Sequence, residues 1–86
     1  MTSQNLAKAA DLAPIIEGVH GAQHPELTRV REIAQDLHVS GDAARTSELF
    51  TELRSLTKNY ALPDDVCEAF KMTYETLESA DQEQSA

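Results

Sequence analysis

The side chains in this sequence that could carry chemistry are three histidines, one cysteine and one Glu-x-x-His pair. Glu17 and His20 form the pair, and His24 follows four residues after His20, a spacing that puts two side chains on one face of a continuous helix. Imidazole and carboxylate groups are common ligands of zinc and of non-haem iron. If the chain binds a metal ion at all, we expect Glu17, His20 and His24 to hold it.

Two neighbouring residues argue against such a metal site. Gly21 is typical of a helix end and Pro25 of a helix start, so the spacing of the two histidines spans a turn. We therefore expect His20 to satisfy the last carbonyl groups of one helix and His24 to cap the next. A di-iron site in a helical bundle also needs a Glu-x-x-His pair from each of two helices, and this chain has one. The sequence predicts no metal cofactor within one chain.

Cys67 is the single cysteine, so a disulfide within the chain is excluded. A thiol near the start of a helix is a candidate for redox or nitric-oxide sensing. The carboxylates of Asp64, Asp65 and Glu68 lie close to it in sequence and disfavour a thiolate, so we expect Cys67 to be a small core residue. The sequence shows no Cys–His pair at a suggestive spacing, no glycine-rich loop and no serine in a strained-turn motif. We therefore expect no enzymatic activity.

The charge of the chain excludes two classes of partner. The formal net charge is -8, and the segment from Asp64 to Ala86 contains seven acidic residues against one basic residue, Lys71. Such a surface repels the phosphates of nucleic acids and of anionic lipids, so we expect neither to bind. No apolar run approaches the roughly 18 residues that span a bilayer, and no secretion signal is recognisable, so we expect a cytoplasmic location. The last residues lack large apolar side chains, which predicts one domain over residues 1–80 and a flexible acidic tail over 81–86.

Apolar residues recur three and four positions apart along four segments, and no segment alternates as a strand does. Short connections favour neighbouring helices that run in opposite directions. The sequence therefore predicts an all-α protein, a short antiparallel four-helix bundle with helices over residues 4–20, 25–38, 42–60 and 63–79. The expected inner faces consist of Ile16, Leu27, Val30, Leu37, Leu49, Phe50, Leu53, Leu56, Tyr60, Val66, Phe70, Tyr74 and Leu77.

Proline and aspartate mark the expected helix boundaries. Pro14 lies inside the first helix, where it removes a backbone donor and predicts a kink. Pro25 and Pro63 suit the first position of the second and fourth helices. Asp42 is a suitable N-cap for the third helix.

Two stretches of the sequence resemble a known family. The first is VHGAQHPEL over residues 19–27, with Leu12, Ala13 and Pro14 before it; the second is LRSLTKNY over residues 53–60, followed by Pro63, Cys67, Phe70, Tyr74, Leu77 and Asp81. Together they resemble the hemerythrin-like iron–sulfur cluster repair proteins, the RIC type, whose usual members are four-helix bundles with a non-haem di-iron site. In that family the histidine and glutamate ligands lie between the two stretches and after the second, where this chain has no counterpart. The resemblance therefore implies the scaffold of the family without its di-iron site.

Three functions remain open from the sequence. The first is a small metal-free helical module related to the repair proteins, with a non-catalytic binding or accessory role in the stress response. The second is an iron-binding repair protein whose site forms between subunits from Glu17, His20 and His24 of each chain. The third is an acidic helical bundle that neutralises a cationic partner, as bacteriocin immunity proteins do. The thin core of so short a chain favours a protein partner, either another protein or a second copy in a homodimer.

Overall fold

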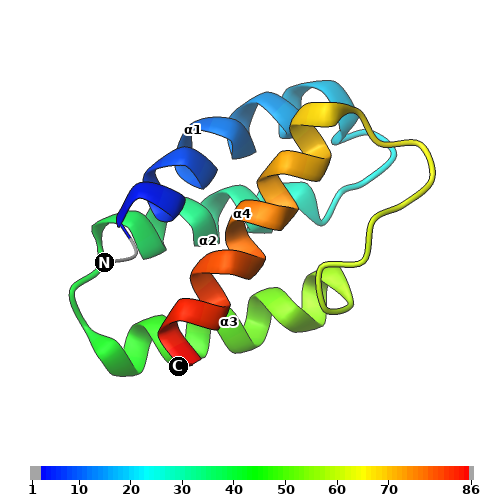
Figure 1. Ribbon diagram of the computed structural model, residues 1–86. Coiled ribbons are helices and arrows are strands. Elements are labelled where there is room, and N and C mark those ends of the chain that lie inside the picture. Colours follow the sequence, from blue (N-terminus) through cyan, green and yellow to red (C-terminus); the bar gives the residue numbers. More distant parts are fainter. Residues whose placement is uncertain (1–2, 86) are drawn as a thin grey trace.

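The computed structural model describes residues 3–85, and within them every regular element is an α-helix. The four helices are α1 (Ser3–His20), α2 (Leu27–Val39), α3 (Ala43–Thr57) and α4 (Glu68–Ser85). They form a helical bundle in which α1 packs against α2 and α4, and α2 also packs against α3. Figure 1 shows that α4 starts beside the end of α1 and finishes beside α3. The all-α fold predicted from the sequence is confirmed.

The core lies where the inner faces of the four helices meet. Its buried members are Leu6, Ala9, Ala13 and Ile16 of α1, Leu27, Val30, Ile33, Ala34 and Leu37 of α2, Leu49, Phe50 and Leu53 of α3, and Phe70, Tyr74, Leu77 and Ala80 of α4. Leu56, Tyr60 and Val66 are partly buried and pack against this core. Fully burying a large apolar side chain contributes about 1.5–3 kcal/mol, so this shared core is the main stabilising feature of the bundle.

The second helix begins at Leu27, two residues later than predicted. Pro25 and Glu26 form a turn instead, in which their carbonyl groups accept hydrogen bonds from residues three positions ahead, at 3.3 and 3.1 Å. The N-cap residue is Glu26, without a side-chain capping bond, so the expected role of His24 as the cap is wrong. The side chain of His24 is engaged elsewhere, as described below. Pro14 lies on the exposed side of α1, which is a single helix from Ser3 to His20.

The third helix begins as predicted and ends earlier. The Asp42 side chain accepts hydrogen bonds from the backbone N–H groups of Ala44 and Arg45, at 2.9 and 3.4 Å, which confirms it as the N-cap. The helix ends at Thr57 rather than at residue 60, because the next three residues adopt left-handed φ angles of 54°, 59° and 65°. Each costs roughly 1–2 kcal/mol for a residue other than glycine. We call residues 58–60 the left-handed turn.

The fourth helix is displaced toward the C-terminus relative to the prediction. It begins at Glu68, so Pro63 lies in a loop over residues 61–67 rather than at a helix start. It continues to Ser85, beyond the predicted end at residue 79. The extra turns are anchored by Asp81, which is 5% exposed and pairs with Arg54 of α3. Within the described part of this extension, Ala80 joins the buried core and the Asp81 ion pair has no apolar signature, so periodicity alone places the boundary too early.

The predicted boundary between domain and tail, at residue 80, therefore falls inside α4. Residues 1, 2 and 86, which belong to the predicted domain over 1–80 and the predicted tail over 81–86, lie outside the described residues.

Candidate functional site

The fold brings Cys67 and His20 together as a pair. His20 is the last residue of α1, and Cys67 immediately precedes the first residue of α4. The distance between His20 Nε2 and Cys67 Sγ is 3.2 Å, within hydrogen-bonding reach for sulfur. When the imidazole proton is on Nδ1, the thiol donates to Nε2. We call these two residues the thiol–imidazole pair.

The exposure of Cys67 contradicts the expectation of a buried core residue. The sequence shows no Cys–His pair at a suggestive spacing because 47 positions separate Cys67 from His20, and the fold brings them together. A helix starting at residue 63 would have placed Cys67 one turn before Phe70 on the inner face. Since the segment is a loop, the thiol instead faces the end of α1.

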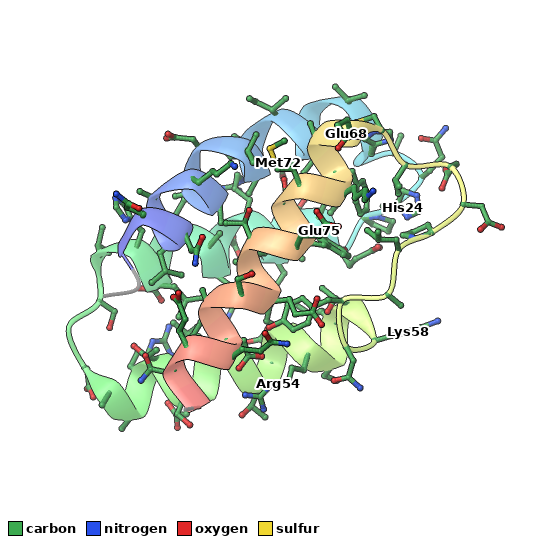
Figure 2. All side chains as sticks on the ribbon, viewed as in Figure 1. His24, Arg54, Lys58, Glu68, Met72 and Glu75 are labelled. Carbon is green, nitrogen blue, oxygen red and sulfur yellow. The ribbon has the colours of Figure 1, made fainter. Side chains whose placement is uncertain are left out.

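A second histidine ties the same loop to the turn between α1 and α2. His24 Nε2 lies 3.2 and 3.3 Å from the two carboxylate oxygens of Asp65, and His24 Nδ1 lies 3.5 Å from Glu26 Oε2. The loop over residues 61–67 is therefore held by His24 through Asp65 and by His20 through Cys67. Figure 2 shows His24 beside this loop, on the side of the bundle where α4 begins at Glu68.

The ring of Phe70 packs against both imidazole rings. Its ring is fully buried and meets the rings of His20 and His24 edge-on, with centroid distances of 5.3 and 5.5 Å and interplanar angles of 77° and 75°. Edge-to-face contacts of this kind contribute about 0.5–1.5 kcal/mol beyond burial. Because Phe70 is fixed in the core, it orients His20 toward the thiol.

Glu17, the third residue of the predicted metal site, is engaged by α2. Arg31 Nε donates to Glu17 Oε1 at 2.6 Å. A hydrogen bond from Thr28, with the contribution of Arg31, holds the pKa of Glu17 below its ordinary value. The structure therefore brings His20 and His24 near each other, with ring centroids 6.4 Å apart, but gives Glu17 to other partners.

The residues present do not fit an iron site of the predicted composition. Among the described residues, no group of three or more His, Cys, Asp and Glu side chains is placed to hold a metal ion. The remaining histidine, His38, is exposed near the end of α2 and away from the thiol–imidazole pair. The thiol–imidazole pair itself places a thiol beside a ring nitrogen that can accept its proton.

The signal in the sequence that could have located this site is the pair of stretches quoted for the family resemblance. The stretch over residues 19–27 contains His20 and His24, and Cys67 follows the stretch over residues 53–60. In the structure these two parts of the chain meet at one end of the bundle.

Comparison of the chain with protein-family models, with curated proteins and with solved structures finds no match. The resemblance to iron–sulfur cluster repair proteins therefore remains a prediction that rests on the two stretches. Within residues 3–85, no helix combines the length and the apolar character needed to cross a bilayer.

Proposed function

We propose that this chain is a small helical module that acts in the stress response through the Cys67 thiol, in a non-catalytic accessory role related to iron–sulfur cluster repair. The observation that supports it is the 3.2 Å contact between His20 Nε2 and the sulfur of an exposed cysteine. The link to cluster repair comes from the sequence resemblance. A cytoplasmic location is part of the proposal, because cytoplasmic reductants keep thiols reduced until an oxidant appears.

The proposed reaction is oxidation of Cys67 by a peroxide. The thiol proton moves to Nε2 of His20, the sulfur attacks one peroxide oxygen, and the O–O bond breaks. The proton then joins the leaving hydroxide, so hydrogen peroxide and the thiol become water and a sulfenic acid. His20 serves as the proton acceptor in the tautomer that carries its proton on Nδ1, because Nε2 then accepts and lies 3.2 Å from the sulfur.

The test is the second-order rate of sulfenic acid formation, followed by mass spectrometry after trapping with a cyclic diketone. We expect His20→Asn to slow the reaction at least about tenfold, because asparagine keeps the polarity but cannot take the proton. His38→Asn, at an exposed position of α2, is the matched control and should react as the unmodified chain does. Equal rates in all three proteins would overturn the proposal.

The alternative of an iron site between subunits makes a different prediction. Because Arg31 and Thr28 engage Glu17, we expect protein loaded anaerobically with ferrous iron and then washed to retain none. Stoichiometric iron that disappears in His20→Ala would instead favour the alternative. The immunity-protein alternative is supported by net charge and size, and a gene for a small cationic secreted peptide beside this one would favour it.

The finer features of the predicted fold belong to the proposal as well. We propose that neighbouring helices run antiparallel, that α1 bends at Pro14 and that the chain forms a homodimer. Residual dipolar couplings measured by NMR report helix directions and the bend; α1 segments with a common axis on both sides of Pro14 would exclude the bend.

A further inference from the structure

A pocket of ≈ 240 Å³ has His24 in its lining, whereas the two residues of the thiol–imidazole pair do not line it. His24 and Glu26 of the turn before α2, Lys58 of the left-handed turn and Tyr74 of α4 contribute its polar groups. Leu56 and Pro63 are among its apolar lining residues. At about 30 Å³ for each water-sized group, the volume accommodates roughly eight such groups, the size of a small metabolite.

Tyr74 is the feature that points to a ligand. Its residue surface is 2% exposed, and its ring is held 4.8 Å from that of Phe70, centroid to centroid. Its hydroxyl has no hydrogen-bond partner among the described residues. Because no fully enclosed side-chain nitrogen or oxygen of those residues lacks a partner, the hydroxyl is accessible at the surface, and Tyr74 is one of the residues that line the pocket. A buried tyrosine hydroxyl normally finds a partner, so this one is available to a bound molecule.

Glu26 supplies a negative charge in the same pocket. Its carboxylate makes no capping bond to α2, and its nearest partner is His24 Nδ1 at 3.5 Å. The other nitrogen of His24 is engaged by Asp65. Burial and the charge of Glu26 raise the pKa of Tyr74 to about 12, so the phenol is neutral at neutral pH and can accept a hydrogen bond from a cation.

The cationic residue that lines the pocket does not cancel this charge. Lys58 is exposed, and Figure 2 shows its side chain directed outward, away from the bundle. The chain as a whole has a net charge of -8, which raises the local concentration of cations at its surface.

We propose that this pocket binds a small organic cation with a primary ammonium group. The ammonium group donates to the Glu26 carboxylate and to the Tyr74 hydroxyl oxygen, and the hydrocarbon part of the ligand lies against Leu56 and Pro63. Cys67 is not among the residues that line this pocket, so the proposed ligand contacts do not involve the sulfur.

The experiment is isothermal titration of the full chain with putrescine, a four-carbon diamine, and with succinate, a four-carbon dianion, at one fixed salt concentration. We expect one putrescine per chain and no succinate. Tyr74→Phe removes a single hydroxyl and keeps the ring on Phe70, and Glu26→Gln removes a single charge. Each should weaken putrescine binding at least fivefold.

The matched control is Glu48→Gln, which removes the same charge from an exposed position of α3 outside the pocket and should change the affinity less than twofold. Equal weakening by Glu48→Gln would overturn the proposal, because it would indicate general attraction to an acidic surface. Failure of putrescine to bind, binding of succinate, or unchanged affinity in Tyr74→Phe or Glu26→Gln would also overturn it.

Discussion

The side chain of Asp81 joins three parts of the fold: α4, α3 and the left-handed turn. Its two carboxylate oxygens accept from Arg54 Nε and Nη2, both at 2.7 Å, and the Tyr60 hydroxyl donates to Oδ2 at 2.7 Å. This group ties α4 to α3 and holds the left-handed turn through Tyr60. Bidentate, charge-assisted bonds are about twice as strong as neutral ones, so Asp81 helps to stabilise a turn that is itself strained.

Replacing Asp81 by Asn should lower the free energy of unfolding by about 2 kcal/mol at neutral pH. Hydrogen bonding from Arg54, together with that from Tyr60, holds the folded-state pKa of Asp81 below its ordinary value of 3.8. The stabilisation is therefore complete above pH 3.8 and is lost as the pH falls through the folded-state pKa.

Urea unfolding of the unmodified chain and of Asp81→Asn across this range should show the difference between them shrinking in acid. Asp11→Asn, on the exposed face of α1, is the control and should stay within about 0.5 kcal/mol of the unmodified chain at every pH. A difference that is constant with pH would contradict the assignment.

At the scale of a single element, the last turn of α1 determines the position of His20. The carbonyl group of Glu17 accepts a hydrogen bond from the Gly21 N–H at 2.9 Å, which closes the last turn of the helix. A Cβ atom at Gly21 would lie 2.5 Å from that carbonyl oxygen, whereas one at Gly18 would meet nothing within 4 Å. Steric crowding therefore requires glycine at position 21, whereas position 18 has room for a Cβ atom.

This contrast predicts opposite effects for two alanine substitutions. Gly18→Ala should stabilise the chain by up to about 1 kcal/mol, because alanine loses less backbone entropy in a helix than glycine does. Gly21→Ala should destabilise it by about 1–2 kcal/mol and should also slow peroxide oxidation of Cys67, because His20 is displaced. Chemical denaturation and the trapping assay measure the two effects; a stable, fully reactive Gly21→Ala protein would show that the turn tolerates a Cβ atom.

At the scale of the whole molecule, apolar side chains are left on the surface of α1. Ile15 and Val19 are 54% and 65% exposed and stand four residues apart on one helix face. A short chain buries a smaller share of its surface than a larger domain does, so association would cover what the core leaves exposed. The homodimer proposed above therefore has a candidate face on α1.

Sedimentation should show a dimer at micromolar concentration that Val19→Glu converts to a monomer, because a carboxylate in an apolar interface loses its hydration without gaining a partner. Val39→Glu introduces the same charge at the end of α2, where Val39 is 77% exposed, and should leave the dimer intact. A monomeric unmodified chain would contradict the homodimer, and dissociation by both variants would contradict the placement on α1.

The residues along the chain are enough to predict its helices and their inner faces. The apolar positions from Ile16 to Leu77 recur at the helical period, and Asp42 caps α3 as expected, because periodicity and capping act over about four neighbouring residues. Tertiary contacts decided that residues 61–67 form a loop before α4 and where α4 ends. Cys67 and Asp65 lie in that loop, where they contact His20 and His24. The α4 helix continues past residue 79, and its Asp81 pairs with Arg54 of α3. These contacts join residues 27 to 47 positions apart, and no local pattern encodes them.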